Sequence, residues 1–457
     1  MCRVSVDELL ERAASVTNLA MLREYAKPSP IQIAAINEYT PLLESKLSAL
    51  SPSDAPTRER ILAQLNIHRS ILAPIRRLPI ELLCDIFLLV LEEYPLRTLQ
   101  AATIVSHVCV TWRNVAREHG ALWTKAVVET LDDFDDYCER FLPMAKHVPL
   151  ELRCDNHKII WDLWDRMTPF ASRWRRITLG ACLSTLRGLK VLYMERLERL
   201  VIFAYDAPIS PDFSVLDFVV APRLRHIGLA LDELQSTRQL HIPVTWALTS
   251  LEITAMSPFP VTNTLPLLRE CSDTLRALTL KIRYPWEDDE GSYPMSTSDT
   301  FVMTALTLLS LVDPACALLN HITAPLLDEL ILSNVPTYGT KSLLGFLARS
   351  QASLRLHILR VYQVKEKEIS AWIPCLRLMD NLSQLHFDEL LSSEEFLRLL
   401  VRLEPPLLPF LEHVAIVHIF WNNPCLEDAI ANLCEAREKQ RVENGRKVYI
   451  PLGWIKE

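Results

Sequence analysis

Histidine, cysteine and acidic side chains are the residues of this chain that could carry chemistry, but their spacing matches no catalytic or metal-binding motif. The chain has 12 histidines and 11 cysteines, with no His-Glu-x-x-His motif and no Cys-x-x-Cys pair. His413 and His418 lack the i, i+4 spacing of two ligands on one helix face. Neither Gly-x-Ser-x-Gly nor Gly-x-x-x-x-Gly-Lys occurs. We therefore predict no catalytic residues, no metal ligands and no cofactor.

Two acidic clusters, at 132–136 and 287–290, are the remaining candidates for chemistry. A carboxylate needs a partner cation, a raised pKa or a cleft to act as an acid or base. The neighbouring sequence supplies none of these, so we expect the first cluster to be a solvated linker face and the second an exposed loop. An enzyme whose site is assembled from distant residues stays open as an alternative, although no constellation favours it.

Composition limits the class of protein. A length of 457 residues predicts two or more domains or an extended repeat architecture. The net charge of −8 does not favour nucleic acid or an anionic membrane as a partner. The N-terminus has no apolar signal core, and no run approaches the ~20 apolar residues that span a bilayer. Scattered cysteines in odd number fit a reducing compartment, so we expect an intracellular protein, cytoplasmic or nuclear or both.

The segment from Leu78 to Val90 carries more apolar surface than one helix face. Pro79 lacks a backbone donor and suits the first turn of a helix, where Glu81 would lie near the positive end of the helix dipole. The apolar residues that follow at helical spacing cover more than one stripe: Leu82, Leu83, Ile86, Phe87, Leu89 and Val90. A short helix that is apolar on two sides needs one partner inside its domain and one outside, which predicts a docking module.

Three blocks of sequence then resemble a known family. They read Leu-Pro-x-Glu-Leu-Leu-x-x-Ile-Phe at 78–87, Val-Ser-x-Val-Cys-x-x-Trp-Arg at 105–113, and Leu-Trp at 122–123. In order and spacing they resemble the F-box, and the surrounding sequence is similar to F-box proteins of mushroom-forming fungi. The resemblance implies a bundle of three short helices that binds the Skp-type adaptor of a cullin–RING ubiquitin ligase. The chain departs from the family at Val110, where a basic residue is often found, and before Leu122, where proline is frequent.

The resemblance assigns twelve residues to this docking module without separating those that touch the adaptor from those that fill the bundle core. They are Leu78, Pro79, Glu81, Leu82, Leu83, Ile86, Phe87, Val105, Cys109, Trp112, Leu122 and Trp123. Trp112 is expected in the core, because Trp112, Val115 and Ala116 form one helical stripe.

Three helices are expected ahead of the module. The first begins at a capping box, 5–8, the second follows Pro-Ser-Pro at 28–30, and the third spans about 57–72 with Ile61, Leu65 and Leu72 on one face. We expect these helices to pack against the module or support it. A dimerising coiled coil is the alternative, although the apolar spacing is not sustained over three or four heptads.

An internal repeat dominates from residue 174 onward. A triplet of the form apolar-x-x-apolar-x-apolar begins at Trp174, Leu197, Leu224, Leu248, Leu275, Leu306, Leu327, Leu356, Leu382 and Leu411. The mean step of about 26 residues lies inside the range of leucine-rich repeats. One short strand per unit cannot bury its apolar side alone, so the units must stack. The consensus asparagine after the strand is absent, and the region resembles the degenerate leucine-rich solenoids that often follow an F-box. An unrelated leucine-rich α/β domain is the alternative.

The predicted fold class is therefore α/β, in three parts. Residues 1–73 form a helical N-terminal extension, 74–127 an F-box-like domain, and 140–457 an irregular leucine-rich-repeat-like solenoid. A degenerate opening unit is expected at 147–152, and a C-terminal cap with a helix that starts after Asn423.

In such a solenoid, residues between the apolar strand positions face the concave surface. The positions that we assign to target binding are Arg199, His226, Glu252, Lys281, Glu329, Arg360, Tyr362, His386 and Asp388. Their mixture of charges and hydrogen-bonding groups suits a protein or peptide ligand.

These expectations combine into a non-catalytic subunit of a ubiquitin ligase. As the resemblance implies, the chain would recognise substrates for an SCF-type cullin–RING ligase in ubiquitin-dependent protein degradation. It would dock a Skp-type adaptor through the F-box and an unknown target protein through the repeats. The alternative is an adaptor-independent leucine-rich-repeat scaffold for protein interactions, which the altered residue at Val110 supports.

Overall fold

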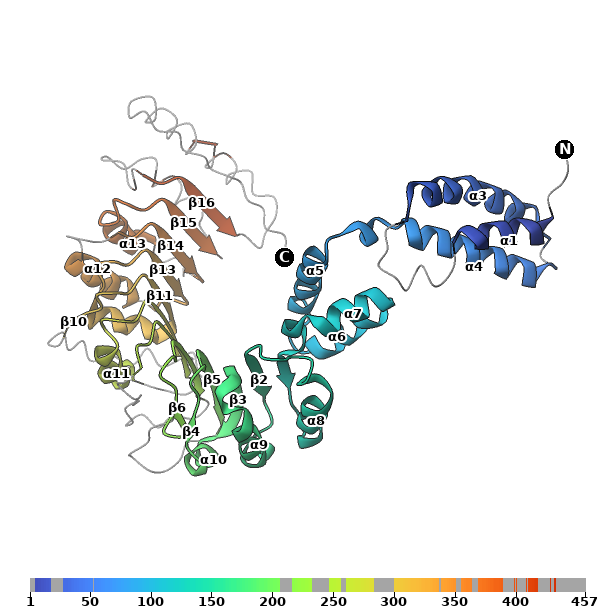
Figure 1. Cartoon of the computed structure of the whole chain (residues 1–457). Helices are drawn as coiled ribbons and strands as arrows, with labels where there is room; N and C mark the ends of the chain where they lie inside the picture. Colours follow the sequence, from blue (N-terminus) through green and yellow to red (C-terminus); the bar gives the residue numbers. More distant parts are fainter. Residues whose placement is uncertain are drawn as a thin grey trace. The chain divides into compact units, whose positions relative to one another are not determined.

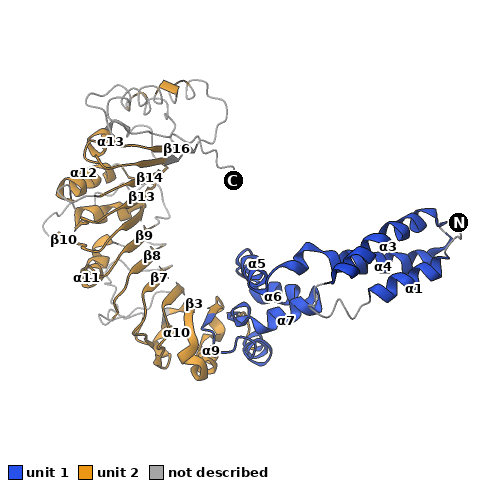
Figure 2. Ribbon diagram, turned by 45° about the horizontal axis from the view of Figure 1, so that its top comes forward, with its two compact units in different colours: residues 1–127, 132–151 blue, residues 128–131, 152–457 orange. Residues whose placement is uncertain are grey.

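The computed structural model contains helices and strands and includes a large parallel sheet (Figure 1). It describes residues 5–17, 28–51, 53–205, 216–231, 246–255, 260–282, 300–336, 338–350, 355–363, 369–388, 398, 400, 408, 410–417, 428 and 431–432. The chain divides into two compact units, coloured separately in Figure 2. Unit 1 comprises residues 1–127 and 132–151, and unit 2 comprises residues 128–131 and 152–457.

The first part of unit 1 contains three helices, as the sequence predicted, and these helices form a bundle of their own. They are α1 (Val6–Val16), α3 (Pro30–Ala49) and α4 (Ala55–Leu72), and each contacts the other two. The Ser5 side chain accepts a hydrogen bond from the Glu8 backbone at the start of α1. A complete capping box links Ser29 and Gln32 at the start of α3. Leu9, Ala13, Leu43, Ile61 and Leu65 are among the residues that form the core, whereas Leu72, expected on the same face, is only half-buried.

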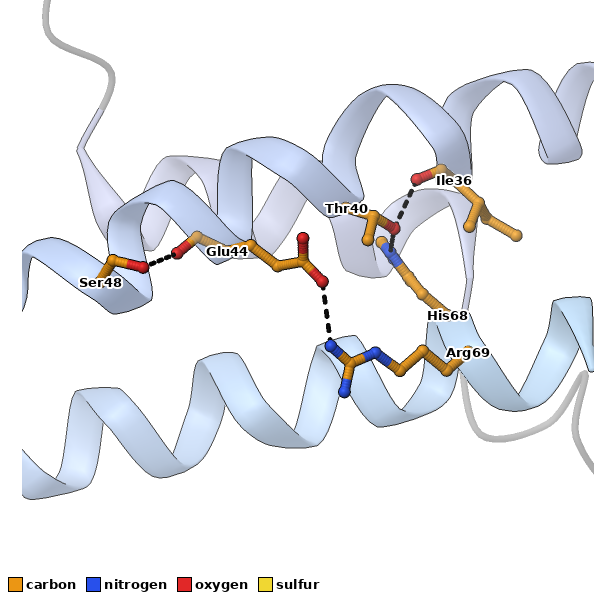
Figure 3. A network of polar contacts seen from close by, with 6 residues as sticks. All are labelled: Ile36, Thr40, Glu44, Ser48, His68 and Arg69. Carbon is orange, nitrogen blue, oxygen red and sulfur yellow. Dashed lines mark hydrogen bonds and ion pairs between the residues drawn. The ribbon is translucent and has the colours of Figure 1, made fainter.

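A row of polar side chains crosses this bundle, and Figure 3 shows the part of it where Thr40 meets His68. The Thr40 hydroxyl donates to the Ile36 carbonyl at 2.7 Å and lies 3.0 Å from His68 Nδ1. Because the Thr40 hydrogen is used, Nδ1 must carry the His68 proton and donate it to Thr40. His68 Nε2 then accepts from the Gln64 amide at 3.2 Å, and that amide also donates to the Thr17 hydroxyl at 2.9 Å. The network is fully bonded with His68 in its neutral Nδ1–H form.

The next part of unit 1 contains three short helices that contact one another. They are α5 (Ile80–Glu92), α6 (Thr98–His107) and α7 (Val110–Glu118), preceded by the 3-10 turn η1 (Pro74–Arg77) and followed by η2 (Gly120–Trp123). Pro79 is the residue before the first turn of α5 rather than inside it, since its φ of −55° and ψ of 147° are extended. The missing amide hydrogen of Pro79 therefore costs the helix no hydrogen bond.

The remainder of unit 1 includes β1 (Lys125–Val127), α8 (Leu131–Asp136), which begins at a residue of unit 2, and a short π-helix at Tyr137–Phe141. The acidic cluster at 132–136 lies on α8. Asp136 pairs with Arg140 at 2.9 Å, and Phe134 between the acidic residues is buried. The cluster is thus a helix surface around one anchoring aromatic ring. The second cluster, 287–290, is outside the described residues.

The sheet of unit 2 supplies one strand for each triplet of the repeat. The strands are β2 (Leu150–Cys154), which spans the boundary between the units, β3 (Trp174–Cys182), β5 (Arg199–Tyr205), β7 (His226–Leu231), β8 (Ser250–Ala255), β9 (Ala277–Ile282), β11 (Leu308–Val312), β13 (Glu329–Ser333), β14 (Ile358–Tyr362), β15 (Gln384–Asp388) and β16 (His413–Val417). They lie side by side in chain order. From β3 to β16 every neighbouring pair is parallel.

The register of this sheet keeps equivalent repeat positions aligned. Leu278 pairs with Leu309, which pairs with Leu330, and the row continues through Leu359 and Leu385. These leucines are 0% exposed. The intervening residues of the same strands are half-buried, so the strands alternate between a core face and an open face.

Three of the described helices of unit 2 lie on one side of the sheet, and we call the opposite side, where the half-buried strand positions lie, the open face. The helices of unit 2 are α9 (Ile160–Met167), α10 (Leu183–Gly188), α11 (Leu265–Glu270), α12 (Gly339–Ser350) and α13 (Ile369–Leu376). In both Figure 1 and Figure 2, α11, α12 and α13 lie on the same side of the strands. Two smaller parallel sheets pair β4 (Leu192–Tyr193) with β6 (Val219–Val220) and β10 (Phe301–Val302) with β12 (Ile322–Thr323). The expected cap after Asn423 falls outside the described residues.

Candidate docking face and open sheet face

Helix α5 has two apolar faces of opposite exposure. Its inner face consists of Leu83, Cys84, Phe87 and Leu91, which are at most 7% exposed. Its outer face consists of Leu82, Ile86 and Leu89, which are 37% to 62% exposed. The two sets follow the i, i+3, i+4 spacing of two separate helix stripes. Ile80, in the first turn, continues the inner stripe but is 46% exposed. The inner face is packed within unit 1, whereas the outer face presents three large aliphatic side chains.

The later blocks of the motif supply buried residues. Val105, Leu122 and Trp123 are at most 6% exposed. The Trp123 indole nitrogen donates to the Ala116 carbonyl at 2.6 Å, which satisfies a buried donor and fixes η2 against α7. Cys109 caps α7, since its sulfur accepts a hydrogen bond from the Trp112 backbone at 3.4 Å. These residues hold the three helices together.

Trp112 is half-buried instead of filling the core. Its ring packs against Phe87 with centroids 4.9 Å apart, and it also lines a cavity of about 210 Å³ in unit 1 together with Arg76, Arg77 and Cys109. The sequence placed Trp112, Val115 and Ala116 on one stripe facing the core. Val115 and Ala116 are buried, whereas Trp112 lies at the margin of the stripe.

The first residues of the motif lie at the surface. Pro79 and Glu81 are exposed and Leu78 is half-buried. The structure therefore divides the twelve motif residues into an exposed group at the start and outer face of α5, a half-buried group, and a buried group that includes Leu83 and Phe87. The half-buried residues are Leu78, Cys109 and Trp112. The sequence-based set omitted Leu89 of the outer face and Ile80, which is exposed at the start of α5. The second apolar stripe at Leu82, Ile86 and Leu89 was the signal that pointed to Leu89.

The open face of unit 2 brings several of the predicted target-binding residues together in pairs. Arg360 donates to the Glu329 carboxylate at 2.7 Å across β14 and β13. Lys281 donates to the Glu252 carboxylate at 3.0 Å across β9 and β8. In both pairs the partners come from adjacent strands, so these charges are largely neutralised within the sheet.

The remaining predicted positions extend these pairs along the strands. His386 is the register partner of Arg360, and Tyr362, also half-buried, is the register partner of Asp388. The side chain of Asp388 is outside the described ones. His226 lies further along the sheet, opposite Arg199 and bonded through Nδ1 to Ser250 Oγ at 2.9 Å.

Burial and neighbouring charges shift the pKa values of several of these groups. Burial, followed by the charge of Arg360, lowers the pKa of His386, and burial followed by Arg199 lowers the pKa of His226. Burial acts to lower the pKa of Arg360, but its bonds to Glu329 and Tyr362 outweigh burial and raise it. The open face therefore holds neutral histidines and charged arginines near pH 7, a set suited to hydrogen bonding and ion pairing.

The described residues contain no cluster of three or more histidine, cysteine, aspartate or glutamate side chains that could hold a metal ion. His413 lies in β16, whereas His418 is outside the described residues. None of the described helices is long and apolar enough to cross a bilayer.

No family model matches the chain, and no curated protein matches it. What the two surfaces can do must therefore be argued from their own geometry.

Proposed function

We propose that the chain is the substrate-recognition subunit of an SCF-type cullin–RING ubiquitin ligase. Helices α5, α6 and α7 would be its F-box-like module, and the outer face of α5 would bind a Skp-type adaptor inside the cell. The sheet of unit 2 would be an irregular leucine-rich-repeat solenoid that binds a target protein. The chain itself would be non-catalytic, and it would accelerate ubiquitin transfer by holding the target close to the conjugating enzyme.

The observation that carries this proposal is the division of α5 into a buried and an exposed apolar face. Exposed single hydrophobic residues are common, but Leu82, Ile86 and Leu89, aligned on one 13-residue helix, form a contiguous apolar surface. Burying them gains roughly 0.8 kcal/mol for each methylene group removed from water. The face lies on the helix whose sequence resembles the first F-box block.

The solenoid part of the proposal is supported by the register of the sheet. Consecutive strands are neighbours, are parallel, and align their apolar triplets row on row. Such an order arises when each repeat unit, which is a strand with the segment that leads to the next strand, stacks on the previous unit.

Co-purification of the full chain with a fungal Skp-type adaptor tests the proposal, with Leu82→Asp as the variant. We expect a stoichiometric complex for the unchanged chain and at least about thirtyfold weaker binding for Leu82→Asp, because a carboxylate would be placed in an apolar interface. Leu82 is 50% exposed, so the substitution leaves the fold intact.

Leu42→Asp is the matched control. Leu42 is 46% exposed, lies in the middle of α3, and undergoes the same change of side chain. Adaptor binding should be unchanged in this variant. A folded chain that does not bind the adaptor, or that binds it equally with Asp at position 82, would contradict the assignment and favour an adaptor-independent repeat scaffold.

A further inference from the structure

The proposed function leaves a cavity of unit 1 without a role. The cavity has a volume of about 210 Å³ and lies between two groups of helices. Ile33 of α3 and Ile71 of α4 line it from the N-terminal bundle, and Leu83 of α5 and Trp112 of α7 line it from the three helices that follow. The space between packed helices is a common place for a small-molecule ligand.

The wall of the cavity is mostly apolar and passes from buried to exposed residues. Ile71 and Leu83 are 3% and 1% exposed and mark the inner part, whereas Ile75 is 39% exposed and marks the mouth. A cavity of about 150 Å³ with aliphatic and aromatic walls holds one benzene ring. At about 210 Å³ this cavity therefore has room for one ring with short substituents.

Two polar side chains of the wall are available to a ligand, one in the inner part and one at the mouth. Thr111 is 9% exposed, and its hydroxyl makes no hydrogen bond with any described residue. Buried hydroxyl groups normally have a partner, so a ligand atom that bonds to Thr111 would satisfy it. Arg77 is exposed at the mouth, and its guanidinium likewise has no partner among the described residues.

The charge of the wall favours a ligand with a single negative charge. Arg76 also lines the cavity, but it already has an interaction partner in the chain. None of the described lining residues is acidic. The free guanidinium of Arg77 matches one carboxylate, which can accept two parallel hydrogen bonds from it. A phosphate group, with a charge of about −2, would keep part of its charge unpaired beside an apolar wall.

Trp112 favours an aromatic ring over an aliphatic chain. Its indole lines the cavity and already packs against Phe87 with ring centroids 4.9 Å apart. Pairs of aromatic rings are attracted by more than the burial of their area alone. A rigid ring also loses less conformational freedom on binding than a flexible chain does.

We propose that this cavity binds a small hydroxylated aromatic carboxylate. The ring lies against Leu83 and Trp112, the carboxylate bonds to Arg77 at the mouth, and the ligand hydroxyl bonds to Thr111 in the inner part. The inference does not rest on the proposed function, because the adaptor surface is the outer face of α5 and Leu83 belongs to the inner face.

Isothermal titration calorimetry of the full chain with three matched probes tests the inference. The probes are para-hydroxycinnamate, its neutral amide, and cinnamate, which lacks the hydroxyl. We expect para-hydroxycinnamate to bind at least about tenfold more tightly than the amide, because the amide loses the charged hydrogen bond to Arg77. It should bind about threefold more tightly than cinnamate, which loses a neutral hydrogen bond.

Two variants assign each polar group of the ligand to its residue. Arg77→Met should weaken the binding of para-hydroxycinnamate at least about tenfold and leave that of the amide unchanged. Thr111→Val keeps the shape of the side chain, so it should weaken the binding of para-hydroxycinnamate about threefold and leave that of cinnamate unchanged.

Arg58→Met is the matched control for Arg77→Met. Arg58 lies in α4, is exposed and does not line the cavity, and its side chain has no partner among the described residues. This variant should bind para-hydroxycinnamate normally. Equal affinity of the Arg77 and Arg58 variants, equal affinity of the unchanged chain for the acid and the amide, or no binding of the acid at about 1 mM would overturn the inference.

Alkylation by iodoacetamide locates the bound ligand. Cys109 lines the cavity and is half-buried, whereas Cys138 is half-buried but does not line it. Saturating para-hydroxycinnamate should slow the alkylation of Cys109 at least about threefold and leave that of Cys138 unchanged, as measured by mass spectrometry. An unchanged rate at Cys109 would place the ligand elsewhere and also overturn the inference.

Discussion

The repeat strands of unit 2 and the helices α4 and α5 of unit 1 treat hydrophobic and polar residues differently. In unit 2 the strands alternate regularly, with leucines such as Leu309 fully buried and Ser310 beside it on the open face. The two helices depart from that order, because α5 exposes Leu82 and Leu89 while α4 buries Gln64 and His68. Each departure costs free energy unless something compensates it: a partner for the exposed leucines, and hydrogen bonds for the buried polar groups.

The largest expected effect contrasts adjacent residues of α5. Phe87→Ala should lower the free energy of unfolding of unit 1 by about 3–5 kcal/mol, because Phe87 is 0% exposed and packs against Trp112. Ile86→Ala should cost under about 1 kcal/mol, because Ile86 is 37% exposed, and should instead weaken adaptor binding. Denaturant unfolding followed by hydrogen exchange at α5 amides measures both. Equal destabilisation by the two variants would show that α5 does not have separate inner and outer faces.

A smaller effect tests the buried polar row of the N-terminal bundle. Burial lowers the pKa of His68, so the unfolded chain binds a proton at higher pH than the folded bundle does. Stability is thus fully present above the ordinary histidine pKa of about 6.5 and is lost as the pH falls through the lower pKa of the folded state. Protonation would also place an N–H on Nε2, which now accepts from Gln64.

Hydrogen exchange of α4 at about pH 8 and about pH 5 measures this loss. His68→Gln should remove most of the pH dependence, since no imidazole remains to be protonated. His107→Gln is the control, because His107 is exposed at the end of α6 and its replacement should leave the pH dependence unchanged. The same pH dependence in the His68 variant would show that the network does not link protonation to packing.

Much of the fold could be predicted where side-chain periodicity and burial agree. The second and third positions of each of the ten triplets fall on a strand of the parallel sheet, since the strand period of two separates core from open positions in the sequence itself. The three N-terminal helices were predicted from their caps and apolar stripes. Gln64 and His68 were not predicted as core residues, because only the partners Thr17 and Thr40, distant in sequence, make their burial favourable.

The candidate sites were less accessible to sequence reasoning. The motif identified α5, but whether Leu82 or Leu83 faces outward depends on which stripe the bundle covers. On the open face, the sequence identified the target-binding residues one strand at a time, as a mixture of charges, without showing which of them pair. Their pairing depends on register between strands that are about 26 residues apart, which is why the Glu329–Arg360 pair emerged only in three dimensions.

The smallest expected effect concerns the ion pairs of unit 2. Because the strands of that unit alternate regularly between core and open face, we expect its stability to depend little on any one ion pair. A double-mutant cycle with Glu329→Ala and Arg360→Ala should give a coupling energy of about 0.5–1 kcal/mol, because the two side chains are 20% and 33% exposed. The cycle with Glu252→Ala and Lys281→Ala should give less, about 0–0.5 kcal/mol, since these side chains are 37% and 36% exposed and better screened by water. Chemical denaturation at low and high salt measures both couplings. A coupling well above 1 kcal/mol at Glu329–Arg360 would show that this open face, like the α4 network, depends on buried polar contacts, and the contrast between the two units would then be one of degree.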